Sequence, residues 1–159
     1  MKAKAALILV PLAAMWLVEL VNILVDHRLV EWGILPRTVS GLLGIPLSPF
    51  IHGSPSHALS NSIPFVVLGG AVLMQGARRY VLLSVFVIFG GGGIVWLMAR
   101  ASFHVGASGV VFGYFGYLLA RGWYEHTFKS IVIAVVALVL YGGVLLGLSP
   151  TSSEISWEG

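Results

Sequence analysis

The chain has 159 residues, of which 58% are hydrophobic and only 9% are charged, with a formal net charge of +3. A soluble domain carries about 25% charged residues, so this composition indicates an integral membrane protein with one domain over residues 1–159. The absence of cysteine excludes disulfides, thiol nucleophiles and zinc–thiolate sites. The small positive charge is spread over the connections between apolar segments and gives no sign of nucleic-acid binding.

Five segments are long and apolar enough to cross a bilayer, whose core of about 30 Å needs roughly 20 helical residues. They are predicted at residues 5–25, 57–75, 80–99, 108–121 and 130–148. The fourth is short, so we expect it to begin below the membrane surface. Lysine and arginine gather in alternate connections, and the positive-inside rule therefore places the N-terminus in the cytoplasm. A long outer loop then follows the first segment.

The first segment begins MKAKAALILV and is also compatible with a signal peptide, because a basic start precedes an apolar run. The run continues to Val25 without a cleavage site of small residues, which favours a membrane helix. Glu19 and Asn22 share a face of this helix, and polar groups inside a membrane point toward protein partners. We expect this pair to join helices by hydrogen bonds rather than to take part in catalysis.

The second segment opens with SPSHALSN, in which Ser54 and Pro55 are typical of a helix N-cap and first position. His57 then lies in the first turn, and Asn61 lies one turn later on the same face. This pair either bonds a neighbouring helix or directs an imidazole and a carboxamide at one ligand. A metal site is not indicated, because HExxH is absent and His52 and His57 have no carboxylate nearby.

The third and fourth segments are rich in glycine, which lets membrane helices approach closely. Gly90–Gly93 lie in the third segment, and we predict a close contact of the fourth at Gly109 and Gly113. Gly106 and Gly109 also bracket Ser108 and are candidates for an accessory role there. Ser108 is expected at the amino end of the fourth helix, where free N–H groups and the helix dipole favour the negative charge of an acyl-transfer oxyanion.

HxxxN at the start of the second segment, combined with GASG at the start of the fourth, resembles the rhomboid intramembrane serine proteases. The similarity extends from ILPR and FIHGSPSH through GASGVVFGYFGYLL to ISWEG. It implies an all-α membrane protein, a polytopic helical bundle with five of six expected spans present, in the plasma membrane of a prokaryote. It also implies a serine–histidine dyad that cleaves transmembrane protein substrates within the lipid bilayer and needs no cofactor or metal.

Carried over by position, the resemblance assigns roles to individual side chains. Ser108 matches the family nucleophile, and His57, Asn61 and the Ser108 N–H match its oxyanion hole. His52 matches a histidine in the loop before the second helix. Phe112, one turn after Ser108, matches an aromatic residue near the catalytic imidazole.

The base of the family is a histidine on a sixth helix, and no histidine of this chain matches it. The five present are His27, His52, His57, His104 and His126. His104 is close to Ser108 in sequence and is the alternative base. We expect the chain to be a truncated product whose gene continues with a histidine soon after Gly159 and then about 20 apolar residues. Because serine without a base is a poor nucleophile, we expect the 159 residues alone to be inactive.

Two other functions fit part of this pattern. A noncatalytic rhomboid-like protein would bind transmembrane helices without cutting them, but such binding does not require Ser108, His57 and Asn61 together. A small transporter or structural membrane protein would line a path with these polar groups and would show no special reactivity at Ser108.

Overall fold

The computed structural model describes residues 2–147, and the described chain is helical, without a strand. The longest elements are α1 (Lys2–Leu24), α3 (Pro55–Leu73), α6 (Ser108–Glu125) and α7 (Phe128–Gly147). A further long helix is built from α4 (Ala77–Phe86), the π-helical turn η3 (Val87–Gly91) and α5 (Gly92–Met98). A helix therefore occupies each of the five predicted segments, and the prediction of an all-α membrane bundle is confirmed. The predicted outer tail, residues 149–159, lies outside the described residues.

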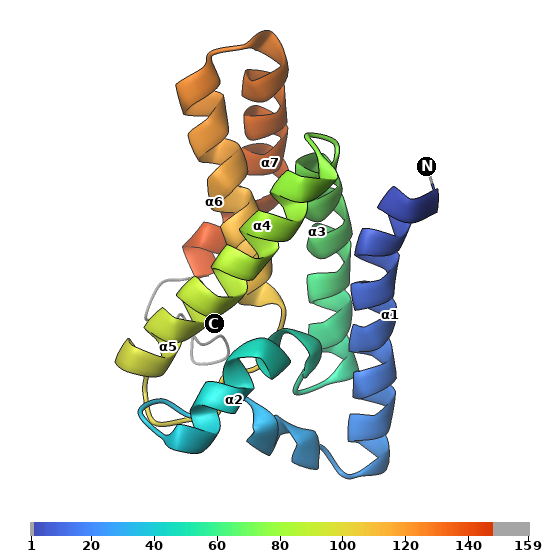
Figure 1. Cartoon of the computed structure of the whole chain (residues 1–159), viewed down its shortest axis with the longest axis vertical. Helices are drawn as coiled ribbons and strands as arrows, with labels where there is room; N and C mark the ends of the chain where they lie inside the picture. Colours follow the sequence, from blue (N-terminus) through green and yellow to red (C-terminus); the bar gives the residue numbers. More distant parts are fainter. Residues whose placement is uncertain (1, 148–159) are drawn as a thin grey trace.

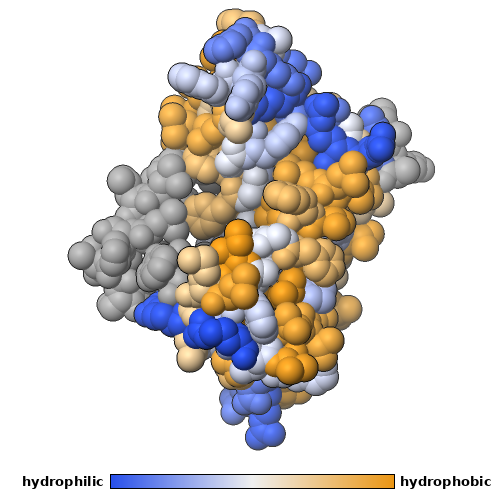
Figure 2. Space-filling model, turned by 60° about the vertical axis from the view of Figure 1, so that its left-hand side comes forward, coloured by the Kyte–Doolittle hydropathy of each residue, from blue (hydrophilic) through white to orange (hydrophobic). Residues whose placement is uncertain are grey.

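Three of the described helices are long and apolar enough to cross a membrane. They are Lys4–Leu24, Pro55–Leu73 and Ala77–Met98. Large apolar side chains are exposed along these helices, for example Leu17 at 62% and Ile94 at 60%. Figure 2 shows such side chains across the middle of the molecule and hydrophilic ones toward its upper and lower ends. An apolar surface of this extent suits contact with lipid rather than water.

The helices pack in a chain of neighbours. α1 lies beside α3, and α3 packs against α6 (Figure 1). After α6 the chain reverses direction through a short connection, and α7 packs against α6. η3 also packs on α6. α2 lies across the end of the bundle where α3 begins (Figure 1). The amino ends of α3 and α6, which carry the polar motifs, are therefore on neighbouring helices.

The main apolar core lies where α3, α4 and α6 meet. It includes Phe65, Leu68 and Tyr114, each no more than 5% exposed. The tyrosine hydroxyl groups in and around this core find partners: Tyr114 Oη lies 2.7 Å from Ser84 Oγ, and Tyr80 Oη donates to the Leu7 carbonyl at 3.2 Å. This core buries apolar area with its polar groups hydrogen-bonded, which is the arrangement that stabilises a fold.

Tight packing of the third and fourth segments is confirmed at Gly113, whereas the prediction for Gly109 is wrong. A Cβ on Gly113 would overlap the Val87 side chain, so this glycine lets α6 approach η3. A Cβ on Gly109 would meet nothing within 4 Å. Within Gly90–Gly93, Gly92 makes the close contact with another element. A Cβ added at Gly92 would lie 2.8 Å from the Ile45 side chain of α2.

The connection between α1 and α3 contains helices that the sequence did not predict. It holds η1 (Arg28–Trp32), α2 (Val39–Leu47) and η2 (Ser48–Phe50). Two glycines of α2 weaken its helical signal, but they are needed for packing. A Cβ on Gly41 would overlap the Leu35 backbone, and one on Gly44 would overlap the Gly33 backbone.

The fourth helix is longer than predicted. α6 continues past Arg121 to Glu125, and the Arg121 Nε lies 2.7 Å from Glu125 Oε1. These two residues are one turn apart, and an ion pair at this spacing supports the last turn of a helix. Its predicted beginning at Ser108 is confirmed.

Candidate active site

The amino end of α3 forms as its sequence predicts. Ser54 is the N-cap, and its Oγ accepts a hydrogen bond from the His57 N–H at 3.2 Å. Pro55 occupies the first helical position, where it costs no hydrogen bond. Asn61 is buried one turn beyond the half-buried His57, and its Nδ2 donates to the His57 carbonyl at 3.0 Å. The carboxamide is therefore held on the same side of α3 as His57.

Backbone hydrogen bonds from the α1–α3 connection hold the loop that leads into α6. Ile34 and His104 exchange two such bonds, at 2.9 and 3.0 Å. Two residues further on, the Gly106 N–H donates to the Ser48 carbonyl at 2.9 Å. Ser108 follows as the first residue of α6. These contacts connect segments more than 50 residues apart in sequence, and they determine where the serine lies.

His57 and Ser108 meet at Gly106. The Gly106 backbone has φ of +116°, a conformation that side chains other than glycine rarely adopt. A Cβ at this position would lie 2.8 Å from His57 Cε1 and 2.9 Å from His57 Nε2, and 3.7 Å from Ser108 Oγ. The imidazole and the hydroxyl therefore approach one point, which only a glycine leaves open.

His52 lies next to His57 and is completely buried. Its Nε2 accepts a hydrogen bond from the Ala107 N–H at 3.3 Å, and its ring stands edge-on to His57 with 5.1 Å between centroids. Burial lowers the pKa of His52 to about 4, and the neighbouring His57 acts more weakly in the same direction. The ring is therefore neutral near pH 7, and because Nε2 is an acceptor, the proton is on Nδ1.

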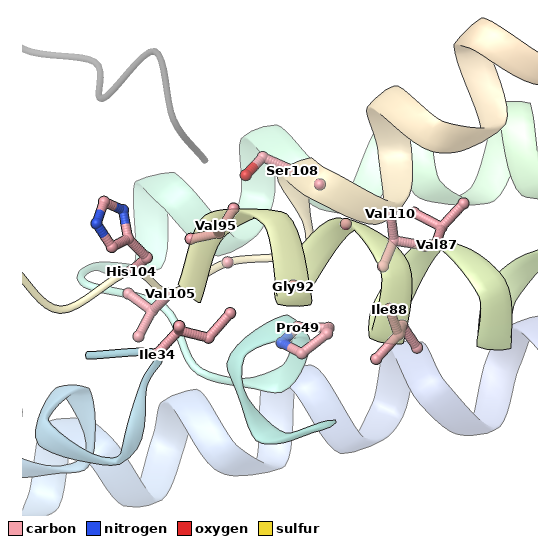
Figure 3. Close-up of a pocket in the computed structure, with 13 residues that line it drawn as sticks. Ile34, Pro49, Val87, Ile88, Gly92, Val95, His104, Val105, Ser108 and Val110 are labelled. Atoms are coloured by element: carbon pink, nitrogen blue, oxygen red, sulfur yellow. The ribbon is translucent and has the colours of Figure 1, made fainter. Parts of the chain in front are cut away.

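A cavity of about 100 Å³ opens beside Ser108 (Figure 3). Its walls are almost entirely apolar and come from both sides: Ile88, Gly92 and Val95 of the η3–α5 region, and Ser108, Gly109 and Val110 of α6. The missing Cβ at Gly109 explains part of its volume, since a side chain there would enter open space. His57 and Asn61 do not line this cavity. Ser108 therefore adjoins the cavity on one side and the His57 ring at Gly106.

The remaining candidates lie near the site or away from it. Phe112 is half-buried one turn after Ser108 in α6. His104 lines the cavity, and its Nε2 lies 3.1 Å from the Arg100 carbonyl oxygen. His27 lies just beyond α1, and His126 lies at the far end of α6. Among residues 2–147, no group of three or more acidic or histidine side chains is placed to hold a metal ion.

Two buried residues of α1 contribute more to this region than the sequence indicated. Asn22 donates from Nδ2 to the His52 carbonyl at 2.8 Å and accepts from the Leu29 N–H at 3.0 Å. It therefore binds two points of the α1–α3 connection and does not join two of the long helices. Glu19 is completely buried, yet neither carboxylate oxygen has a hydrogen-bond partner in the described structure. The expectation that both residues join helices by hydrogen bonds is therefore wrong. Their shared buried face was visible in the sequence, but their partners were not.

Comparisons with known proteins identify the family of this chain. The model of the Rhomboid domain matches residues 39–159, and the chain belongs to the rhomboid family. Uncharacterized proteins of Mycobacterium tuberculosis (strain ATCC 25618 / H37Rv) and Mycobacterium bovis are each 35% identical to it over 161 residues, covering 96% of this chain and 67% of theirs. RHOMBOID-like protein 4 of Arabidopsis thaliana is 35% identical over 101 residues, 62% of this chain and 26% of that protein. No solved structure matches significantly.

The chain spans about two thirds of the length of the mycobacterial relatives. Membership of the family makes it an integral membrane protein of the class that contains rhomboid-type intramembrane proteases and related proteins.

Proposed function

We propose that this chain carries the nucleophile and the oxyanion hole of an intramembrane serine endopeptidase that cleaves transmembrane protein substrates. The supporting observation is the approach of the Ser108 hydroxyl and the His57 imidazole to one point at Gly106. Membership of the rhomboid family supports the same conclusion. The site is at the end of the bundle opposite the basic N-terminus, so the positive-inside rule gives it a noncytoplasmic location.

In this mechanism Ser108 Oγ attacks the scissile carbonyl carbon, and the carbonyl oxygen becomes an oxyanion. The Ser108 N–H at the amino end of α6 and an N–H of His57 donate to that oxygen. Asn61 Nδ2 has two hydrogens, one of which is bonded to the His57 carbonyl, which leaves the second for the oxyanion. Collapse of the intermediate releases the amine product, which takes the proton that the base removed from Ser108. Water then gives a proton to the base and attacks the Ser108 ester, and the base returns this proton to Ser108 Oγ as the acid leaves.

The apolar cavity beside Ser108 is suited to the substrate side chain next to the scissile bond. Its volume of about 100 Å³ and its walls of valine, isoleucine and glycine favour a small aliphatic group. Binding such a group there would bring the carbonyl carbon to Ser108 Oγ, because Ser108 is part of the wall.

The base that removes the Ser108 proton is assigned to a histidine other than the five in this chain. His57 is used as an oxyanion donor, and His52 Nε2 already accepts the Ala107 N–H. The alternative base, His104, has its Nε2 near the Arg100 carbonyl oxygen. The cleavage assay therefore uses the full-length gene product, and residues 1–159 without a further histidine are expected to show only background cleavage.

The test is cleavage of a model transmembrane substrate in reconstituted liposomes. Ser108→Ala should abolish cleavage, since the nucleophile and its base act as one unit. Asn61→Ala should lower kcat by about 100- to 1000-fold but leave measurable activity, because the other oxyanion donors remain. Unchanged cleavage by Ser108→Ala would reject the proposed function. Binding of the substrate without cleavage would favour a noncatalytic rhomboid-like protein instead.

A further inference from the structure

We propose that Arg37 is a positioning residue that holds the carboxyl end of α5 and, through α5, sets the width of the cavity beside Ser108. This width decides which substrate side chain fits next to the scissile bond. The proposal rests on the proposed protease function, in which the cavity receives that side chain. Arg37 is not part of the cavity wall in the described structure, so it acts through α5 and is not a catalytic residue.

The carboxyl end of α5 is capped by Arg37, which belongs to the α1–α3 connection. The last carbonyls of a helix have no partner within that helix. The Arg37 N–H donates to the Trp96 carbonyl at 3.0 Å. The Arg37 Nη1 donates to the Leu97 carbonyl at 3.2 Å and to the Ala99 carbonyl at 2.8 Å. Arg37 therefore binds the end of α5 through its backbone and its side chain, and its positive charge suits this end of the helix dipole.

The backbone of Arg37 adopts a conformation that is unfavourable for most residues other than glycine. Its φ is +60°, in the left-handed region, where a Cβ crowds the backbone. Glycine adopts this conformation without that cost, but it has no guanidinium group. The contacts of the side chain with α5 therefore explain an arginine at this position better than the turn does.

The position of α5 depends on its attachment to the α1–α3 connection. α5 packs mainly against α2, whereas η3 packs on α6; Figure 1 shows α5 at the end of the long helix that lies near α2. Trp96 Nε1 donates to the carbonyl of Thr38, the N-cap of α2, at 2.8 Å. The glycine run at residues 90–93 has low helix propensity, so the helix itself does not hold α5 rigidly in line with α4.

α5 also forms one wall of the cavity beside Ser108. Gly92 and Val95 line the cavity from α5, and Ser108 lines it from α6. Figure 3 shows the Val95 side chain next to Ser108. The Val95 carbonyl accepts from the Ala99 N–H at 2.9 Å, and Arg37 binds the Ala99 carbonyl. Without Arg37 the last turn of α5 would loosen and the wall at Val95 would move. Because the cavity has a volume of only about 100 Å³, a small movement changes which side chain fits.

The test compares variants of the full-length gene product. Arg37→Leu removes the side-chain donors, whereas Arg37→Lys keeps a cation with three N–H donors. Trp96→Phe keeps an aromatic ring but removes the hydrogen bond to the Thr38 carbonyl. Thr38→Val is the matched control, because the Thr38 hydroxyl binds the Gly41 N–H of α2 and the Leu35 carbonyl rather than α5.

Two properties are measured for each variant, together with its melting temperature in detergent. The first is the rate of amide hydrogen exchange in the last turn of α5, residues 95–99. The second is kcat and KM in liposomes for two transmembrane substrates. These substrates differ in one side chain next to the scissile bond, which is alanine or phenylalanine.

We expect the wild type to prefer the alanine substrate by about 100-fold in kcat/KM, because a small pocket discriminates by size. Arg37→Leu should lower this preference by about tenfold, mainly by raising KM for the alanine substrate with kcat within about threefold. It should also speed amide exchange at the end of α5 by about tenfold or more. Trp96→Phe should act in the same direction with a smaller effect.

The two remaining variants separate the contact with α5 from general stability. Arg37→Lys should keep the preference and the exchange rate within about threefold of the wild type, since its ammonium still donates to the carbonyls. Thr38→Val should lower the melting temperature but leave the preference and the exchange rate unchanged.

An unchanged substrate preference in Arg37→Leu, despite faster exchange in α5, would overturn the proposal, because α5 would then not set the width of the cavity. Unchanged exchange would overturn it as well. So would an equal loss of preference in Thr38→Val, which would assign the effect to general loosening of the connection. If Arg37→Leu does not fold, Trp96→Phe decides the same question. A wild-type protein without protease activity would reject the proposed function and the role of the cavity, whereas the exchange rates would still decide whether Arg37 holds α5.

Discussion

The two sides of α3 differ in how completely their buried polar groups are hydrogen-bonded. Toward α4 and α6, α3 packs in an apolar core where the Tyr114 and Tyr80 hydroxyl groups are hydrogen-bonded. Toward α1, Trp16 and Asn22 are hydrogen-bonded. Both Glu19 oxygens and the His52 Nδ1, however, are buried without a partner in the described structure.

This difference implies that the two sides of α3 contribute unequally to the stability of the bundle. Each unpaired buried polar group costs about 1–3 kcal/mol, so the unpaired groups of Glu19 and His52 lower the stability that the α1 side gains from burial. The α4–α6 side buries large apolar side chains without such a cost. We conclude that the apolar interface contributes more to the stability of the bundle, whereas the polar interface includes the hydrogen bond from Asn22 to the His52 carbonyl.

The largest effect is expected for Gly106→Ala, which should lower the rate of cleavage. Alanine would require an unfavourable backbone at φ of +116°, and its Cβ would lie 2.8 Å from His57 Cε1. Displacing either partner by about 1 Å can cost about 100-fold in rate, so kcat should fall by about that factor or more. Gly53→Ala is the control, because a Cβ there meets nothing within 4 Å. Equal cleavage rates for both variants would show that contact at Gly106 is not needed.

The second largest effect is expected for the stability of the fold, which should decrease at low pH because of His52. Its folded pKa is about 4, whereas an unfolded histidine titrates near 6.5. Between these values the unfolded chain binds a proton that the folded chain does not, so stability falls as pH drops through this window. The loss should total roughly 3 kcal/mol by pH 4. Melting temperatures in detergent at pH 7 and pH 4.5 measure it, and His52→Gln should show a smaller decrease; an equal decrease would assign the effect to other groups.

The smallest effect concerns the apolar side, at Gly113. Gly113→Leu would force a side chain into Val87 of η3, and overpacking of this kind costs about 1–3 kcal/mol. At Gly116 on the same helix a Cβ would meet nothing within 4 Å, so Gly116→Leu should leave the melting temperature nearly unchanged. Cleavage per folded molecule should stay near the wild-type level in both variants. Equal melting temperatures would contradict close packing of α6 against η3.

Local signals in the sequence predicted the parts of the site that depend on one helix at a time. The N-cap at Ser54 and the start of α6 at Ser108 follow from residue types that favour helix ends, and both are observed. The glycine at Gly106 was visible as a neighbour of Ser108, although its positive φ was not.

The remaining features depend on contacts between distant segments. The hydrogen bond from Ala107 to His52 joins residues 55 apart, and the bond from Asn22 to the His52 carbonyl joins residues 30 apart. No periodicity in the sequence encodes either contact. α2 was not predicted for a related reason. Its glycines lower the helix propensity, and their close contacts with Leu35 and Gly33 form only in the folded chain.

Covalent labelling by a fluorophosphonate probe measures whether the Ser108 hydroxyl is an activated nucleophile. The full-length gene product is labelled in membranes, digested and analysed by mass spectrometry. We expect one modified serine, Ser108, with labelling lost in Ser108→Ala, slowed in Gly106→Ala and unchanged per folded molecule in Gly113→Leu. A folded protein in which Ser108 stays unlabelled, or in which Gly106→Ala reacts as fast as the wild type, would contradict an activated nucleophile at this position.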